Sequence, residues 1–209
     1  MDGSRVLRIV RLISLLVVLA AMVAQAKTLA DANAFDPTRF FAFFTIQSNL
    51  VGVAAFAWLV ARGDDPRSRA IELFRTGAAV YLSVTFFIVI FLLSGVDVQL
   101  QLGWVDVVLH KIFPIIVVAD LIIDPPRTRL IAHDIVTLLI YPLVWTLLTV
   151  LRGAVDGWYP YPFLDPVHGG YGQVAITIVA VVIGFIVIAA AIIWVGNWRR
   201  AAARDPQPA

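Results

Sequence analysis

The sequence predicts an all-α integral membrane protein with six transmembrane helices and both termini in the cytoplasm. The first observation is composition: 61% of the 209 residues are hydrophobic, 14% are charged, and the mean hydropathy is +0.90. Soluble domains contain about 45–50% apolar and about 25% charged residues, so this chain has more apolar surface than a soluble fold of its length can bury. Composition therefore excludes an ordinary cytosolic enzyme and a disordered chain.

The second observation is the spacing of the apolar segments. A helix that crosses a bilayer needs about 20 mostly apolar residues. Residues 6–26 form the first such run, which is too long for a cleaved signal peptide. Polar and charged joints separate it from the next two runs. The first three predicted helices are residues 6–26, 40–61 and 73–93.

The last three predicted helices are residues 104–123, 135–151 and 174–195. A short charged joint with Arg127 and Arg129 separates the first two of these. The paired broken segments that are typical of inverted-repeat transporters are not visible. We therefore expect a single domain over residues 1–209, ending in a short cytoplasmic tail, 199–209.

The third observation is the distribution of Lys and Arg, which are enriched on the cytoplasmic side of membrane proteins. In the predicted topology, twelve of the 16 basic residues lie on one side, three on the other, and Lys111 lies inside a helix. The twelve-residue side holds both termini, which we therefore expect in the cytoplasm of a multi-pass plasma-membrane protein. The three outer residues are Lys27, Arg39 and Arg152.

One outer loop, residues 152–172, is long and rich in aromatic residues and proline. It reads RGAVDGWYPYPFLDPVHGGYG, and its prolines forbid a regular helix. One interpretation is an aromatic belt at the lipid headgroups. The other is a lid over the mouth of a cavity, because long loops with their own packing are often functional.

A group of polar residues lies near the outer end of the second predicted helix, where the chain reads FFTIQSNL. Thr45 and Asn49 are four residues apart and share a face, with Ser48 beside them and Gln47 next in sequence. Polar groups at membrane depth need a partner or a function. A hydrogen bond from Thr45 to its own helix, or bonds between helices, are the structural alternatives.

His110 lies at a similar depth in the fourth predicted helix, within WVDVVLHKIFP. At about 1.5 Å per residue, His110 and Thr45 are both roughly 7–9 Å below the outer boundary. They can meet if the second and fourth helices are neighbours. Asp106, one turn outward, can fix the tautomer of His110. Lys111 is next to His110 in sequence but points away from it on the helix. We expect its amine either to extend outward to the membrane surface or to pair with Asp97 or a substrate carboxylate.

The sequence offers little for metal, cofactor or nucleic-acid binding. It has no cysteine, and its three histidines lie at three different depths, so we expect no metal and no cofactor. The 16 basic and 14 acidic residues nearly balance, and no stretch is basic enough to follow a phosphate backbone. Nucleic acid is therefore not an expected partner, whereas membrane lipids are. The oligomeric state cannot be inferred.

Three sequence blocks resemble the androgen-induced-protein-like family of multi-pass membrane proteins. FFTIQSNL is similar to the threonine-bearing segment of that family, WVDVVLHKIFP to its histidine segment, and GWYPYPF to an element after its fifth helix. The blocks lie within residues 40–172, and the six-helix count also fits. The excess of arginine over lysine and the abundant alanine are typical of a bacterial member.

The resemblance implies an intramembrane hydrolase of fatty acid esters of hydroxy fatty acids. Thr45 is then the nucleophile and His110 the base, with their site facing the outer leaflet. We expect Asp106 to orient His110, Asn49 or Gln47 to donate to the oxyanion, and Ser48 to flank the nucleophile. A substrate carboxylate can pair with Lys111 or Arg152.

The competing interpretation is a non-enzymatic lipid sensor or transporter that uses the same polar cavity. A transporter should have a polar path to both faces, through Asp120 near the cytoplasmic end of the fourth helix. A hydrolase should have an apolar pocket that opens only near the outer leaflet. We also expect Asp120 to pair with an arginine at the interface.

Overall fold

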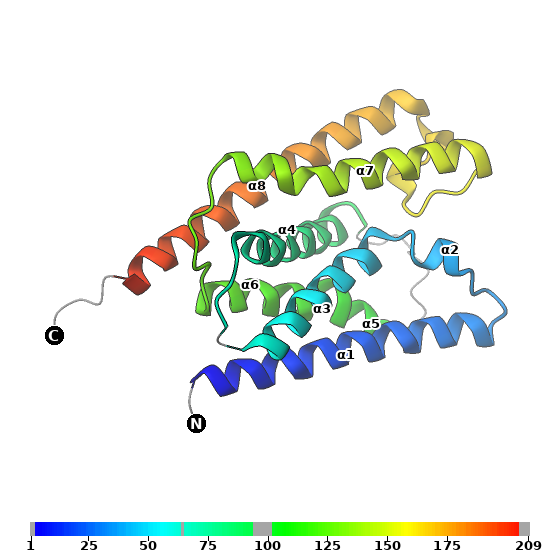
Figure 1. Cartoon of the computed structure of the whole chain (residues 1–209). Coiled ribbons are helices and arrows are strands. Elements are labelled where there is room, and N and C mark those ends of the chain that lie inside the picture. The colour runs from blue at the N-terminus through cyan, green and yellow to red at the C-terminus, as the bar shows by residue number, and fades with distance from the viewer. Residues whose placement is uncertain (1–2, 64, 94–101, 205–209) are drawn as a thin grey trace.

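The computed structural model describes residues 3–63, 65–93 and 102–204, and within these residues it is helical without strands (Figure 1). The longest elements are α1 (Gly3–Asp31), α3 (Phe44–Arg62), α4 (Arg69–Phe91), α7 (His133–Asp156) and α8 (Gly170–Arg204). The short elements are α2 (Pro37–Phe40), α5 (Gly103–Val107), the π-helical turn η1 (Val108–Ile112), α6 (Phe113–Ile123) and the 3₁₀ turns η2 (Pro162–Leu164) and η3 (Pro166–His168).

Five helices in the described residues are long and apolar enough to cross a membrane: α1, α3, α4, α7 and α8. The segment expected at residues 104–123 is helical throughout, but it is divided into α5, η1 and α6. None of these three pieces alone has the length of a membrane span. The membrane-protein class is therefore supported by five helices, and the sixth crossing stays a prediction.

The α4 helix lies between two groups of helices (Figure 1). One group consists of α1, α3 and α6, and the other is the pair α7 and α8. Figure 1 also shows that the start of α1 and the end of α8 lie at the same end of the bundle.

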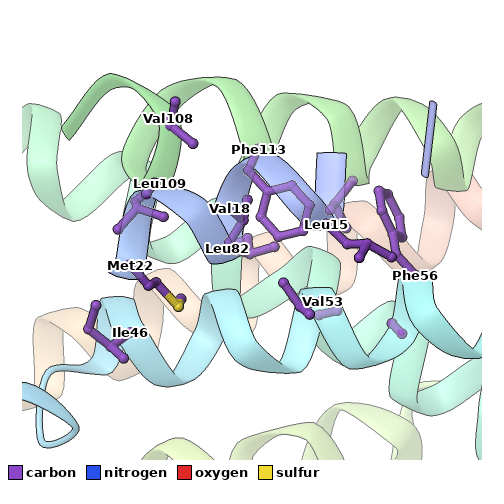
Figure 2. Close-up of a cluster of buried hydrophobic side chains, with 14 of the residues drawn as sticks. Leu15, Val18, Met22, Ile46, Val53, Phe56, Leu82, Val108, Leu109 and Phe113 are labelled. Carbon is purple, nitrogen blue, oxygen red and sulfur yellow. The ribbon is translucent and has the colours of Figure 1, made fainter. Parts of the chain in front are cut away.

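The first hydrophobic cluster holds α1, α3, α4 and α6 together (Figure 2). Glycine at position 52 permits close packing here, because a Cβ atom at Gly52 would lie 2.7 Å from the ring of Phe113 and 2.9 Å from Leu82. Burial of such side chains contributes about 1.5–3 kcal/mol each relative to water. Figure 2 shows α1 and α3 beside the segment that carries Val108, Leu109 and Phe113, so this packing places η1 next to the start of α3.

A buried ionic network closes the end of the bundle that contains the joint between α3 and α4. Asp120 accepts from Arg11 at 2.6 Å and from Arg75 at 3.1 Å, as expected for a carboxylate at this depth. Asp124 pairs with Arg67 at 2.6 Å, and Glu72 bonds both Arg67 and Arg75. A buried charge needs such pairing to be tolerated. The network fastens α1, α4 and α6 to one another.

Candidate active site

The first turn of α3 presents Thr45 to the interior. Phe43, the residue before the helix, provides no side-chain cap, so the first amide groups of α3 need partners from elsewhere. The hydroxyl oxygen of Tyr161 accepts one of them, from the Thr45 backbone nitrogen at 3.2 Å. The positive end of the α3 dipole therefore lies at Thr45.

His110 lies in the π-helical turn η1, four residues before Pro114. Proline has no amide hydrogen, so it cannot donate to the carbonyl of His110 in a regular helix. π-Helical turns interrupt α-helices and are frequent at functional sites. The turn places the imidazole toward α3, and the His110 residue is 3% exposed.

The structure brings Thr45 and His110 together. The Thr45 hydroxyl oxygen lies 3.1 Å from His110 Nε2, and both residues are buried. Asp106 Oδ1 lies 2.8 Å from His110 Nδ1. An ionised carboxylate only accepts hydrogen bonds, so Nδ1 carries the proton and Nε2 is left to accept from the Thr45 hydroxyl. A hydroxyl, an imidazole and a carboxylate in this order are the groups that a nucleophile, its base and the group that orients the base require.

Asn49 connects the two elements that carry these groups. Its amide nitrogen donates to the Thr45 carbonyl at 2.8 Å and to the Leu109 carbonyl at 3.2 Å. These two bonds use both of its N–H groups. Asn49 therefore holds α3 against η1, and no N–H of its amide is left for a substrate.

The other polar residues of the second predicted helix point elsewhere. Ser48 bonds the Thr45 carbonyl at 3.1 Å and Thr85 at 3.2 Å. Gln47 donates to the Phe41 carbonyl at 2.7 Å and accepts from Tyr141 on α7. Neither Ser48 nor Gln47 lines the pockets described below, so both have structural partners in this arrangement.

Two pockets meet at Thr45 and Tyr161. One, of about 40 Å³, lies among α4, α7 and α8 and is almost wholly apolar. The other, of about 130 Å³, contains His110 as well as Thr45, and also the buried Gln25 and the guanidinium-bearing Arg39. Thr45 therefore borders both a dry and a partly polar pocket, whereas His110 lines only the partly polar one.

The outer loop covers these pockets. Tyr161 is 6% exposed and stacks on Phe163, whose ring centroid is 5.2 Å away. Trp158 lines the larger pocket, and the guanidinium carbons of Arg39 and Arg152 both lie 5.3 Å from its ring centroid. Part of the loop is thus packed into the protein, whereas Tyr171 is 56% exposed.

The two cations expected for a substrate carboxylate lie outside both pockets. Lys111 is half exposed and bonds Asp106 at 3.4 Å. Its other expected partner, Asp97, lies outside the described residues. Arg152 bonds Asp156 and the carbonyl and hydroxyl oxygens of Thr38. Arg39 is the cation in the lining of the larger pocket, within the described part of the chain.

Sequence reasoning missed three residues of this site: Tyr161, Arg39 and Gln25. Gln25 carried a usable signal, because it is a polar residue inside a predicted transmembrane segment. Tyr161 and Arg39 carried none, because aromatic and basic residues are common at any outer membrane surface. They are identified as site residues only by the fold, which brings Tyr161 beside Thr45 and Arg39 into the lining of the larger pocket.

No protein-family model, curated protein or solved structure matches the chain. The resemblance of the three short sequence blocks to a known family therefore stays a prediction. Among the described residues, no group of His, Cys, Asp and Glu could hold a metal ion.

Proposed function

We propose that this protein is an intramembrane lipid-ester hydrolase with Thr45 as nucleophile and His110 as general base. The observation that carries the proposal is the buried 3.1 Å contact between the Thr45 hydroxyl and His110 Nε2, with Asp106 behind the imidazole. An isolated threonine is a weak nucleophile at neutral pH and needs an adjacent base. Here that base is positioned and its tautomer is fixed.

The reaction would proceed through an acyl-threonine. The Thr45 oxygen attacks the ester carbonyl carbon while its proton passes to His110 Nε2. Collapse of the tetrahedral intermediate breaks the ester C–O bond, and the leaving alcohol takes the proton from His110. A water then attacks the acyl-threonine, again giving its proton to His110. The second collapse releases the acid, and Thr45 recovers the proton.

The two pockets suggest how an ester would be held. The part of an apolar acyl arm nearest the ester would lie in the dry pocket among α4, α7 and α8, and the corresponding part of the second arm would lie in the larger pocket. Arg39 would pair with a carboxylate on that second arm, a role for which Lys111 and Arg152 lie less suitably. Fatty acid esters of hydroxy fatty acids, the substrates implied by the family resemblance, have two apolar arms and one carboxylate.

The membrane arrangement is part of the proposal. The α5–η1–α6 segment would form the sixth crossing, with both termini in the cytoplasm and the site in the outer half of the plasma membrane. The Lys and Arg distribution supports this orientation. A substrate would then enter from the outer leaflet, and membrane lipids would surround the apolar outer faces of α7 and α8.

The transport alternative receives less support from the structure. Its expected polar path runs through Asp120, but Asp120 is 4% exposed and paired with Arg11 and Arg75. A cavity beside Asp120 and Arg75 measures about 10 Å³. That is about the volume of one water probe, too little for a lipid. A lipid sensor without catalysis differs from the hydrolase only in its chemistry.

Covalent labelling by an alkyl fluorophosphonate distinguishes the hydrolase from a lipid sensor without catalysis. The Thr45 oxygen would attack phosphorus and displace fluoride, which requires an activated hydroxyl. We expect one covalent label, on Thr45, in purified protein. Thr45→Ala should abolish it and His110→Ala should reduce it by about 10²–10⁴ in rate. Ser48→Ala, the matched hydroxyl on the same helix, should label normally.

The same three variants should change the hydrolysis of a branched fatty ester in parallel with labelling. Full activity of Thr45→Ala would contradict the nucleophile assignment. Label on Ser48 with Thr45 untouched would move the nucleophile but keep the hydrolase class. Folded wild-type protein that neither labels nor hydrolyses the ester would overturn the proposal in favour of a lipid-binding sensor.

A further inference from the structure

In the proposed reaction, the negative charge that develops on the ester carbonyl oxygen has no assigned hydrogen-bond donor. When Thr45 attacks a carbonyl carbon, two electrons of the C=O bond move onto the oxygen. Hydrolases stabilise this oxyanion with donors already in place, and one such donor contributes about 10²–10³ in rate. The sequence suggested Asn49 or Gln47. Both amide hydrogens of Asn49 are used, and Gln47 lies outside the pockets.

Tyr161 is the second polar side chain, besides His110, within hydrogen-bond distance of the Thr45 hydroxyl. Its hydroxyl oxygen lies 3.4 Å from the Thr45 oxygen and accepts from the Thr45 backbone nitrogen at 3.2 Å. Since the Thr45 hydroxyl gives its hydrogen to His110, the Tyr161 hydroxyl is the donor in the 3.4 Å contact, and it can turn this hydrogen to a carbonyl oxygen beside Thr45. Both pockets include Tyr161 in their lining, so an ester spanning them passes this hydroxyl.

We propose that the Tyr161 hydroxyl is a third catalytic group, besides Thr45 and His110, which donates a hydrogen bond to the oxyanion of the tetrahedral intermediate. This inference rests on the proposed hydrolase function. The proton stays on tyrosine throughout: Thr45 gives its proton to His110, and Tyr161 only polarises the carbonyl oxygen. The position agrees with the general requirement that the reacting centre lie about 3 Å from both nucleophile and donor.

The surroundings of Tyr161 suit a donor. Burial raises the pKa of the Tyr161 phenol, and its hydrogen bonds with Thr45 offset only part of that rise. The phenol therefore remains protonated at physiological pH. The edge-to-face contacts with Phe43 and the stacking with Phe163 hold the ring, so little motion is needed when the charge develops.

A structural role is the competing explanation, because the same hydroxyl caps the first turn of α3. Tyr161→Phe removes the hydroxyl but keeps the ring packing. We expect its kcat to fall by about 10²–10³ with little change in KM, because the lost bond exists only in the transition state. Tyr171→Phe, an exposed tyrosine beside the same loop, should retain wild-type kcat. A folded Tyr161→Phe protein with normal kcat, or with only KM raised, would overturn the inference.

A second measurement needs no folded Tyr161→Phe variant. Wild-type protein containing 3-fluorotyrosine has five fluorine sites, because the chain has five tyrosines. The resonance of Tyr161 can be assigned by eliminating the other four with Tyr→Phe variants. A phosphonylated Thr45 places a phosphoryl oxygen where the oxyanion would be, so this resonance should shift and that of Tyr171 should not.

Failure of the proposed hydrolase function and failure of the proposed Tyr161 role give different results in these experiments. Wild-type protein that neither hydrolyses esters nor accepts the phosphonate would overturn the hydrolase and the tyrosine role together. Active, phosphonylated protein with an unshifted Tyr161 resonance would overturn the tyrosine role alone.

Discussion

The hydroxyl oxygen of Thr45 lies 3.1 Å from Nε2 of His110, although 65 residues of sequence separate the two. No local motif brings them together. Thr45 starts α3, His110 lies in a π-helical turn, and Asn49 bonds the backbone of both elements. Because the contact depends on helix packing, substitutions that weaken the packing should affect chemistry as well as stability.

Asp106→Asn should lower ester hydrolysis, but by less than His110→Ala. The asparagine retains the shape of the side chain and loses the charge that stabilises the imidazolium formed when Thr45 attacks. The loss should be a part of the about 10²–10⁴ that a general base contributes. Steady-state kinetics of both variants on one ester measure this difference. If Asp106→Asn lost as much activity as His110→Ala, the substituted asparagine would be stabilising the unproductive tautomer of His110.

Asn49→Ala should weaken the connection between α3, which carries Thr45, and η1, which carries His110. It leaves the Leu109 carbonyl without the Asn49 amide, and an unsatisfied buried group costs about 1–3 kcal/mol. We expect a lower melting temperature and slower phosphonate labelling of Thr45. Ser48→Ala, which removes a neighbouring buried hydroxyl, is the control for stability without loss of the α3–η1 connection. Equal labelling rates in these two variants would contradict the positioning role of Asn49.

Arg39→Gln should raise KM for an ester with a free carboxylate and leave KM for its neutral methyl ester unchanged. Arg39 lies in the lining of the larger pocket, where it also pairs with Asp36 at 3.7 Å, whereas Lys27 pairs with Asp31 outside that lining. Lys27→Gln is therefore the matched control for Arg39→Gln, because it also removes one positive charge from the predicted outer side. Kinetics with the two esters provide the measurement. If both variants respond alike, the effect comes from general surface charge and not from recognition.

The helices and the Asp106–His110 pair were predictable because they depend on periodic features, whereas the Thr45–His110 contact also needs α3 and η1 to be neighbours, which the sequence left open. A four-residue spacing places Asp106 and His110 on one face of any helix, and counting residues gives their depth. The π-helical turn was not predictable from Pro114 alone, since proline also bends helices without one. It also shortens the regular pieces of the fourth segment, which explains why this segment is not among the five helices of membrane-spanning length in the described residues.

The parts of the site contributed by irregular chain were not predictable. Tyr161 reaches Thr45 through a loop that contains three prolines and has no repeating pattern. Gln47 shows the reverse case: it adjoins Thr45's polar neighbours in sequence, but its partner is Tyr141 on α7. Neighbouring positions on a helix point about 100° apart, so adjacency in sequence is poor evidence for a shared pocket.

Asp124→Asn should lower stability most clearly near neutral pH. Burial by itself raises the pKa of Asp124, but Arg67, Arg75 and Arg11 more than offset this and hold the pKa well below its ordinary value near 3.9. A depressed pKa means that the stabilisation is complete above the unfolded-state pKa and is lost as the pH falls toward the folded-state pKa. The carboxylate thus contributes at pH 7 and loses its contribution progressively below about pH 4.

Thermal unfolding of wild type and Asp124→Asn in detergent, from pH 7 to pH 3, measures this dependence. We expect a difference of about 3 kcal/mol at pH 7, at the lower end for a broken buried pair because the Asp124 side chain is 25% exposed. The difference should shrink as the solution is acidified. Asp31→Asn, at an exposed surface pair, should give about 0–1 kcal/mol at most. A difference that grows with acidification would show that Asp124 does not stabilise as a carboxylate.

The chain contains no cysteine, so single cysteines can report the membrane orientation without a background. Val155 is 89% exposed at the end of α7 next to the outer loop, and Ala203 is exposed near the end of α8. In intact cells a membrane-impermeant maleimide should label Val155→Cys and not Ala203→Cys. After permeabilisation both should react. Because α8 connects these two ends, labelling of both sites in intact cells would mean that α8 does not cross the membrane. The reverse pattern would place the Thr45–His110 site near the cytoplasmic leaflet and contradict entry of substrate from the outer one.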